Sequence, residues 1–236
     1  MDRFIRSVAA TADYVKAKVR SKKTMMLSFD EWNVWYMKQV KLQPWEQAPA
    51  ILEDRYSLLD ALVVGGMLIT LINNADRVRM AALAQLVNVI APIFTEKGGR
   101  VLRQTIFYPF AMAAHYGMGT VLHPLIHSDQ EGTKSYEAVP LVHSATIYNE
   151  EKAELTVFVL NRSKESLNLD LDFRSFGMLV FMEHQILDGP DLNACNDFEH
   201  PERVHPRQVK LKDAAASSFT VNLTAYSWNM LRFKVG

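Results

Sequence analysis

Apolar residues in the first half of the chain alternate between helical spacing and short continuous runs. Residues 2–20 have apolar side chains three or four positions apart, which predicts an amphipathic helix: Phe4, Val8, Ala12, Val15 and Val19. Asp2 is in position to cap the start of this helix, and basic residues crowd its end, as the helix dipole favours. A nearly continuous apolar run at 24–29 follows, and its lack of alternation predicts a strand that is covered on both faces.

The alternation of helix and strand then continues. Residues 37–53 contain prolines and no apolar periodicity, which predicts a long loop. A second helix, largely buried, is predicted at 54–73, and a short strand at 76–84. A third helix is predicted at 103–116, with Pro109 as a local irregularity. Helices and strands in this order indicate an α/β architecture with parallel strands.

The pattern changes at about residue 120. Short segments rich in Val, Thr, Leu and Phe are separated by Asn, Asp, Gly and Pro, which predicts an antiparallel β-sandwich. The predicted strands lie at 139–148, 155–161, 167–173, 179–187, 218–223 and 228–234. A long surface loop is predicted at 188–208, where glycine and proline are frequent. The chain is therefore expected to divide into an α/β part at 1–119 and an all-β part at 120–236.

Composition excludes several classes of partner. The formal net charge of the 236 residues is zero, because 26 basic residues balance 26 acidic ones. A nucleic-acid-binding protein needs a basic face, so no nucleic acid is expected as a partner. The apolar window at 58–72 contains Asp60 and is shorter than the roughly 18–20 residues of a membrane span, so we expect a buried helix and no membrane.

The N-terminus and the cysteine content favour a reducing compartment. The chain begins without an apolar run behind a basic start, so no secretory signal is expected. Cys195 is the single cysteine of the sequence, which means that no intrachain disulfide can form. Together these features fit a reducing compartment such as the cytoplasm.

The run at 28–36 carries most of the candidate chemistry. Its apolar strand ends in two carboxylates, Asp30 and Glu31, and three aromatic residues follow closely. Sugar pockets combine flat aromatic faces with polar groups for hydroxyls, so the run indicates carbohydrate chemistry. Adjacent strand residues face opposite sides, so we expect one carboxylate to face a cavity and the other to be structural. The alternative is that both are solvated loop acids.

The neighbouring polar and aromatic residues also have two interpretations. Trp32, Trp35 and Tyr36 could shape a sugar pocket, or they could cover the rim of the fold as packing. Gln85 follows the second predicted strand, where its amide could bind sugar hydroxyls. The same amide could equally satisfy backbone groups of its loop, which is the commoner fate of buried amides.

Other motifs point away from metal and phosphate chemistry. The seven histidines show no metal-ligand spacing, and a proline between His123 and His127 disfavours the helix that would present both. Gly65 and Gly66 lie inside an apolar helix, which predicts close packing of that helix against a strand. The dipeptide at 149–150 lies between two predicted strands and is expected to be a hairpin turn.

These motifs together resemble the C-terminal half of a glycoside hydrolase family 51 α-L-arabinofuranosidase. The run at 28–36 is similar to the family's nucleophile motif, and 60–68 is similar to its next barrel helix. Residues 84–92 and 103–110 are similar to its last strand–loop and its last helix. The resemblance covers essentially the whole chain and is most specific at 24–125.

The resemblance implies a fold and an activity. The fold would be α/β followed by all-β: the last strands and helices of a (β/α)8 TIM barrel, incomplete in this chain, and a C-terminal antiparallel β-sandwich of jelly-roll type. The activity would be retaining, exo-acting release of terminal α-L-arabinofuranose from arabinan, arabinoxylan or oligosaccharides. Glu31 would be the nucleophile, Gln85 would hydrogen-bond the sugar, and Trp35 would help shape the pocket. No metal or organic cofactor is implied, and family members are typically intracellular hexamers.

The chain departs from the family in one large respect. Family members are about twice as long, and their acid/base glutamate lies in an Asn-Glu motif on an earlier barrel strand. Asn149 and Glu150 form the single Asn-Glu dipeptide of the sequence, and they lie in the β-rich part. Retaining hydrolysis uses two carboxyl groups about 5–5.5 Å apart, of which this chain is expected to supply one. The expected partners are therefore the missing N-terminal barrel half or other subunits, and this chain by itself is expected to be inactive.

A non-enzymatic function is the alternative. The β-sandwich would then mediate assembly or weak glycan binding, while the barrel segment packs against a partner. The residues encoded directly upstream would discriminate between the two hypotheses, because an Asn-Glu strand there favours the enzyme.

Overall fold

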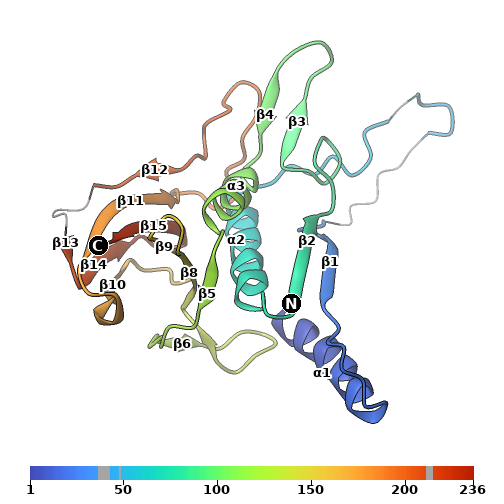
Figure 1. Ribbon diagram of the computed structural model, residues 1–236. Helices are drawn as coiled ribbons and strands as arrows, with labels where there is room; N and C mark the ends of the chain where they lie inside the picture. Colours follow the sequence, from blue (N-terminus) through green and yellow to red (C-terminus); the bar gives the residue numbers. More distant parts are fainter. Residues whose placement is uncertain (37–42, 48, 211–214) are drawn as a thin grey trace.

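The computed structural model describes residues 1–36, 43–47, 49–210 and 215–236 (Figure 1). The first half contains three helices and four strands: α1 (Asp2–Lys18), β1 (Leu27–Trp32), α2 (Leu58–Asn73), β2 (Val78–Leu83), β3 (Ile93–Thr95), β4 (Val101–Arg103) and α3 (Phe107–Tyr116). The second half is built almost wholly of strands: β5 (Thr120–Leu122), β6 (Gln130–Glu131), β7 (Val139–Pro140), β8 (Val142–Asn149), β9 (Glu154–Asn161), β10 (Leu167–Asp172), β11 (Leu179–Leu187), β12 (Arg207–Gln208), β13 (Ala215–Ala216), β14 (Ser218–Leu223) and β15 (Ser227–Val235). A short 3-10 helix at Arg174–Phe176 precedes β11.

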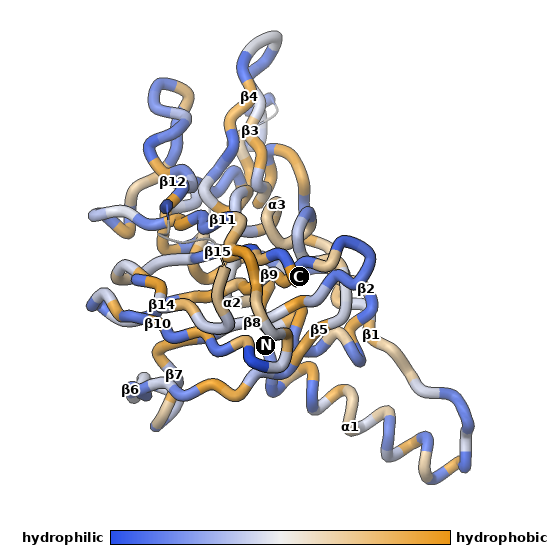
Figure 2. The backbone as a smooth tube through the Cα atoms, turned by 60° about the vertical axis from the view of Figure 1, so that its left-hand side comes forward, coloured by the Kyte–Doolittle hydropathy of each residue, from blue (hydrophilic) through white to orange (hydrophobic). Residues whose placement is uncertain are grey.

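Helix α1 forms where the sequence predicts it, but it presents a different face to the protein. Its buried residues are Ile5 and Ala9, whereas the predicted apolar face is largely open, with Phe4 63% exposed. Figure 2 shows apolar and polar positions alternating along this helix. The prediction that Asp2 caps the helix is wrong, because Asp2 is its first residue and pairs instead with Arg6. Periodicity locates an apolar face but does not say whether anything in the same chain covers it.

Strands β1 and β2 form a parallel pair, with α2 between them in sequence. The predicted strands at 24–29 and 76–84 are therefore present, although β1 begins later and runs on through both carboxylates. The expectation that the first strand is covered on both faces is wrong for this chain, because only Trp32 of β1 is buried. Helix α2 begins at Leu58 and not at residue 54, because Ser57 and Asp60 form a reciprocal capping box. The predicted buried character of this helix is confirmed, since nine of its residues are buried.

A hairpin that the sequence analysis missed lies between β2 and α3. Strands β3 and β4 pair antiparallel around a turn in which Gly98 has a positive φ of 67°. The Lys97-Gly98-Gly99 sequence is a recognisable turn signal. The hairpin occupies the start of the predicted helix at 103–116, which actually begins at Phe107. Pro109 lies in the first turn of α3, where a missing backbone N–H costs little.

The C-terminal part is an antiparallel β-sandwich, as predicted. Seven strands form one sheet in the order β12-β11-β15-β9-β8-β5, with β13 also paired to β11. The second layer is the pair β10–β14, whose leucine and phenylalanine side chains pack on one face of the large sheet. The predicted hairpin turn at 149–150 is confirmed, because it connects the antiparallel strands β8 and β9. The long loop at 188–208 is confirmed apart from the short strand β12 at its end.

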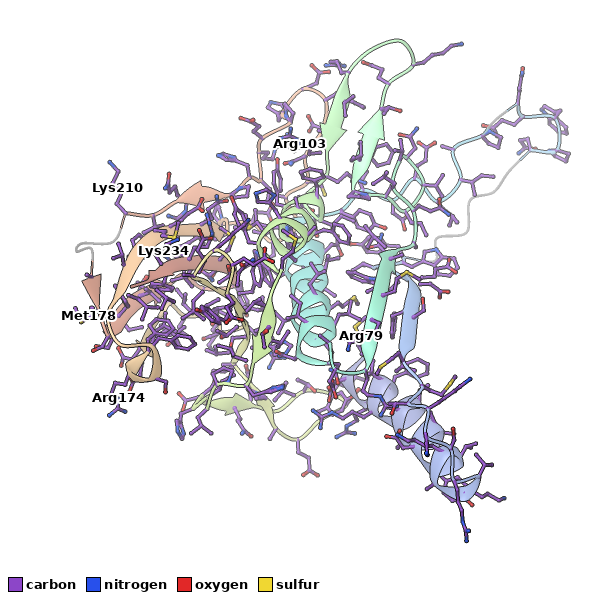
Figure 3. All side chains as sticks on the ribbon, in the orientation of Figure 1. Arg79, Arg103, Arg174, Met178, Lys210 and Lys234 are labelled. Carbon is purple, nitrogen blue, oxygen red and sulfur yellow. The ribbon has the colours of Figure 1, made fainter. Side chains whose placement is uncertain are left out.

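Helix α2 covers the other face of the large sheet. A single apolar core joins Leu58, Leu62 and Ile69 of the helix to Phe158 and Trp228 of the strands. Side chains fill the space between α2 and the sheet in Figure 3. The predicted close packing at the two glycines is confirmed, because a Cβ on Gly65 would lie 2.5 Å from the Trp228 ring and one on Gly66 would lie 3.1 Å from Leu160.

The predicted loop at 37–53 lies partly outside the described residues, at 37–42 and 48. Its described residues contain neither helix nor strand. Within the described part of the chain, no helix is both long enough and apolar enough to cross a membrane.

Buried histidine makes the stability of the sandwich depend on pH. His184 is 1% exposed, its Nε2 lies 3.1 Å from Asn229 Oδ1, and burial, together with the nearby charge of Arg207, lowers its pKa. Burial also lowers the pKa of His143, with Arg162 acting in the same direction. The unfolded chain therefore binds protons more readily than the folded chain, so stability rises with pH through this range.

We accordingly expect the free energy of unfolding to fall as the pH drops through the ordinary histidine pKa of about 6.5. Urea denaturation at about pH 7.5 and about pH 5.5 measures the effect. His184→Gln, which keeps an amide next to Asn229, should show a smaller loss between the two values. An equal loss in the wild type and the variant would contradict the role of His184.

Candidate active site at the carboxyl ends of two parallel strands

The carboxyl ends of β1 and β2 bring two of the predicted site residues to the same edge of the fold. Trp32 pairs with Leu83, and the Ala84 N–H donates to the Trp32 carbonyl at 3.0 Å. Glu31 directly precedes Trp32, and Gln85 directly follows Ala84. The two segments are 54 positions apart in sequence, and the parallel pairing places them next to each other.

A β-bulge changes the expected geometry of the two carboxylates. Phe29 pairs with Ala81 and Trp32 with Leu83, so Asp30 and Glu31 together oppose the single residue Ala82. The strict alternation assumed in the sequence analysis is therefore wrong at this point, because a bulge interrupts the two-residue repeat. Bulges are frequent beside active sites, where they redirect side chains.

Both carboxylates of the bulge are available to a ligand or a partner. Asp30 and Glu31 are exposed, and among the described residues no side chain forms an ion pair or hydrogen bond with either. The structural hydrogen bond expected for one of the two carboxylates is therefore not present within the described part. Each oxygen retains its acceptor capacity for a molecule that approaches this edge.

The three aromatic residues after the bulge have three different environments. Trp32 is 5% exposed and packs against Phe110 and α2, so the packing interpretation is correct for this residue. Trp35 is 54% exposed and available for contact. Tyr36 stacks on Tyr56, and its hydroxyl donates to Asp60 at 2.5 Å. Partial burial and this carboxylate raise the pKa of Tyr36 to about 12, so its hydroxyl stays protonated as a donor.

Gln85 and Gln104 differ in what their side-chain amides contact: the first is open to a ligand, and the second satisfies backbone groups. Gln85 is exposed, and its side chain has no hydrogen-bond partner in the described residues. Gln104 is 1% exposed and satisfies backbone groups, donating to the carbonyls of Ala91 at 2.7 Å and Asp54 at 3.1 Å. Because the Gln85 amide has no structural partner among the described residues, it suits a residue that binds a ligand.

The sequence analysis missed the supporting residues of this edge. Asn33 and Tyr56 connect the loops after β1 and β2 through buried or half-buried hydrogen bonds. Asn33 lies inside the run at 28–36, so its position was available as a signal, but nothing in the sequence indicated its partner. Burial raises the pKa of Tyr56, with the carboxylate of Asp54 acting in the same direction, so Tyr56 also stays protonated.

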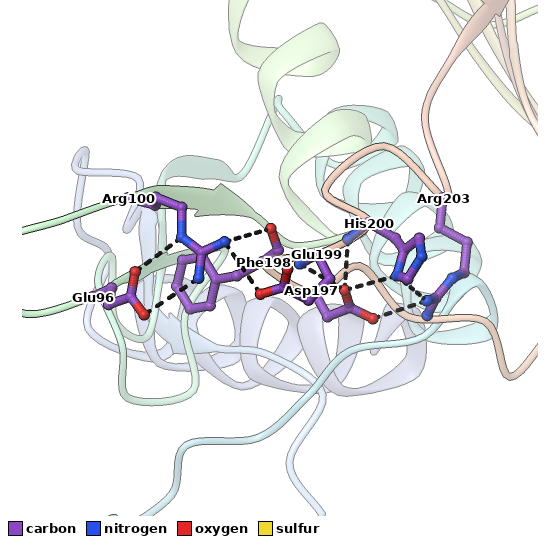
Figure 4. A network of polar contacts seen from close by, with 7 residues as sticks. All are labelled: Glu96, Arg100, Asp197, Phe198, Glu199, His200 and Arg203. Carbon is purple, nitrogen blue, oxygen red and sulfur yellow. Dashed lines mark hydrogen bonds and ion pairs between the residues drawn. The ribbon is translucent and has the colours of Figure 1, made fainter.

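The β3–β4 hairpin extends on the same side of the molecule as these strand ends (Figure 1). Figure 4 shows how it is fastened to the loop at 197–203: Arg100 binds Glu96 at 2.9 Å, the Phe198 carbonyl at 3.0 Å and Glu199 at 3.2 Å. The hairpin is thus linked to the second half of the chain through the Arg100 side chain.

Comparison with known proteins identifies the family. A family profile described as the alpha-L-arabinofuranosidase C-terminal domain matches residues 30–227. The chain belongs to this family. The matched region begins at the bulge and includes the whole of the β-sandwich up to the start of β15.

Full-length relatives of the family are arabinofuranosidases. The chain is 46% identical over 99% of its length to the intracellular exo-alpha-(1->5)-L-arabinofuranosidase 1 of Bacillus subtilis, covering 47% of that protein. It is 43% identical over 99% of its length to the exo-alpha-(1->6)-L-arabinofuranosidase of Bifidobacterium longum, again covering 47% of that protein. The chain thus spans about half the length of the curated relatives that it matches.

Solved structures agree with this assignment. A family 51 alpha-L-arabinofuranosidase from Bifidobacterium longum superposes with a TM-score of 0.87 at 35% identity, covering 99% of this chain and 46% of that one. The GH51 arabinofuranosidase from Xanthomonas axonopodis superposes with a TM-score of 0.78 at 27% identity, covering 99% and 45%. The chain therefore corresponds to the C-terminal half of a GH51 arabinofuranosidase.

Proposed function

We propose that this chain is the C-terminal half of a retaining, exo-acting α-L-arabinofuranosidase, with Glu31 as its nucleophile. The observation that carries the proposal is the exposed Glu31 carboxylate, which has no partner among the described residues and lies in a bulge next to the Gln85 segment. Gln85 would hydrogen-bond the bound arabinose, and the exposed Trp35 would shape the pocket. The substrates would be arabinan, arabinoxylan and their oligosaccharides, as the family resemblance implies, and the relatives are named exo-acting α-L-arabinofuranosidases. Neither a metal nor an organic cofactor is needed for this chemistry.

The proposed reaction needs two carboxyl groups. Glu31 would attack the anomeric carbon and form a covalent arabinosyl-enzyme, while a second carboxylic acid gives its proton to the departing aglycone oxygen. Water, deprotonated by that second group, would then release arabinose and free Glu31. The acid/base glutamate would come from the N-terminal half of the enzyme.

The proposed partner is that N-terminal half, which would complete the barrel. In the described residues β1 and β2 pair only with each other, so the outer edge of each strand is open. An apolar cavity of about 300 Å³ lies beside β2, lined in part by Leu68, Met80 and Phe110. Open edges and apolar surface of this kind need cover. The exposed apolar side chains of α1 would be covered in the same way.

The domain and cellular assignments follow from the same proposal. Residues 1–119 would be the end of the (β/α)8 barrel, and residues 120–236 the sandwich, of jelly-roll type. The enzyme would act in the cytoplasm, as expected from relatives that are named intracellular. Further copies of the completed enzyme would be the other partners.

The test is reconstitution from two halves. We expect the purified chain alone to hydrolyse an aryl α-L-arabinofuranoside no faster than buffer, because one of its two carboxyl groups is absent. Co-expression with the N-terminal half of the Bacillus subtilis relative should give a copurifying, active assembly. A copurifying assembly without activity would contradict the proposal. Binding of arabinan by the chain alone, combined with such an inactive assembly, would favour the glycan-binding module instead.

A further inference from the structure

Asn33 lies at the junction of three chain segments beside the candidate site. Its Nδ2 donates to the Ile90 carbonyl at 2.6 Å and to the Tyr56 hydroxyl at 3.1 Å. Its Oδ1 accepts from the Val34 N–H at 2.8 Å, and the Tyr56 hydroxyl in turn donates to the Val34 carbonyl at 2.9 Å. Both N–H donors of the Asn33 amide are thus used by the protein, and its oxygen accepts one backbone hydrogen bond.

The segment that Asn33 holds is backbone-strained. Ile90 has a φ of 37° and Leu52 a φ of 54°, and the Ile90 N–H donates to the Leu52 carbonyl at 2.7 Å. A positive φ is a true outlier for a β-branched residue such as Ile90. Strain of this kind persists only where the surroundings enforce it, and it gathers at functional sites. Ile90 is also buried, so its carbonyl needs the Asn33 donor.

The buried amide of Gln104 acts on the same segments from the other side. It donates to the Ala91 carbonyl and accepts from the Tyr56 N–H at 3.0 Å. The loop after β2 is therefore attached at two consecutive residues, Ile90 through Asn33 and Ala91 through Gln104. Gln104 reaches the loop at 33–57 near its end, at Asp54 and Tyr56, whereas Asn33 holds the start of this loop, close to Trp35 in sequence.

We propose that Asn33 is a positioning residue that fixes the segment carrying Gln85 to the segment carrying Trp35. The inference rests on the proposed function, because it assigns to Asn33 the alignment of two proposed sugar-binding side chains. Asn33 acts through the backbone of Ile90 and the hydroxyl of Tyr56 and does not touch the sugar. Its loss should therefore weaken arabinose binding through Gln85.

The variant Asn33→Asp isolates this contact. The side chains have the same shape, but the aspartate presents an oxygen where the two donated hydrogen bonds begin: it faces the Ile90 carbonyl, which cannot donate, and the Tyr56 hydroxyl, whose proton is donated to Val34. The matched control is Asn88→Asp in the same segment. Asn88 is linked to Thr95 of the hairpin, and its Oδ1 accepts from the Thr95 N–H at 2.8 Å, a bond that aspartate retains.

Amide hydrogen exchange on the chain itself gives the first test. Asn33→Asp should accelerate exchange in peptides covering 84–92 by about tenfold or more, because the strained segment opens locally. Asn88→Asp should leave the exchange of the Ile90 amide at the wild-type rate. Equal exchange in Asn33→Asp and wild type would overturn the proposal, whatever the activity of any assembly.

A kinetic cycle in the reconstituted two-half enzyme gives the second test. Asn33→Asp should lower kcat/KM by about tenfold, chiefly through KM, and should do no further harm in a Gln85→Ala background. A purely structural function would reduce the amount of active enzyme, leave KM unchanged and give additive losses with Gln85→Ala. An inactive wild-type assembly would contradict the proposed function, and the exchange measurement would still decide the function of Asn33.

Discussion

Glu31→Gln should abolish arabinofuranosidase activity in the reconstituted enzyme, with kcat lowered by about 10⁴-fold or more. An amide cannot form the covalent arabinosyl intermediate, and replacement of a nucleophile generally causes losses of this size. Initial rates on an aryl α-L-arabinofuranoside measure the effect. The variant should fold normally, because the Glu31 side chain is exposed and has no partner in the described residues. An unchanged thermal midpoint verifies this.

The bulge provides a matched control for this variant. Asp30 lies in the same bulge, is also exposed and is also a carboxylate, but it is not the proposed nucleophile. Asp30→Asn should therefore retain activity within about tenfold of wild type. If Asp30→Asn lost its activity while Glu31→Gln kept near-normal rates, Asp30 and not Glu31 would be the nucleophile. Normal rates in both variants would show that neither carboxylate of the bulge takes part in catalysis.

Gly65→Ala should lower the free energy of unfolding by about 2 kcal/mol, although alanine is the better helix former. An added Cβ would lie 2.5 Å from the ring of Trp228, which is fully buried and stacked on Phe158. The ring cannot move away without disturbing the core between α2 and the sheet. The cost of overpacking should thus exceed the gain in helix propensity of about 1 kcal/mol. Urea denaturation of the purified chain measures the difference.

Gly66 supplies the control for this prediction. A Cβ there would lie 3.1 Å from the end of the Leu160 side chain, a contact that a small shift of this flexible side chain relieves. Gly66→Ala should accordingly be neutral or slightly stabilising, since only the helix-propensity gain is left. Equal destabilisation of both variants would mean that glycine flexibility, and not the close approach to Trp228, is what α2 requires.

Local pattern was sufficient for most elements of the fold. The six long strands of the sandwich are predicted to within a few residues, because alternation along a strand records which side faces the core, whereas the short strands β5, β12 and β13 were missed. The parallel strands and α2 are also found where the apolar runs lie. Errors occur at element ends: the capping box at Ser57 and Asp60 shortens α2, and the hairpin around Gly98 replaces the start of the third helix. Both had short sequence signals that apolar periodicity alone does not reveal.

The site was only partly predictable. The adjacency of Glu31 and Gln85 follows from a general rule, since the carboxyl ends of neighbouring parallel strands meet at one edge. The bulge does not follow, because it depends on register: two residues of β1 against one of β2. The Asn33 contact with Ile90 joins residues 57 positions apart and requires an unusual φ, and no local pattern encodes either.

The sequence by itself determined the class of each segment, the α/β-then-sandwich order, the close packing at Gly65 and the resemblance to family 51. These depend on spacing and residue type within one segment, which the chain carries in linear order. The tertiary structure alone decided which face of α1 is buried and how the two carboxylates of the bulge are presented. It also decided that the Gln104 amide binds backbone groups whereas the Gln85 amide is exposed. Each of these depends on contacts between segments far apart in sequence, and such contacts exist only after the strands have paired and the helix has packed.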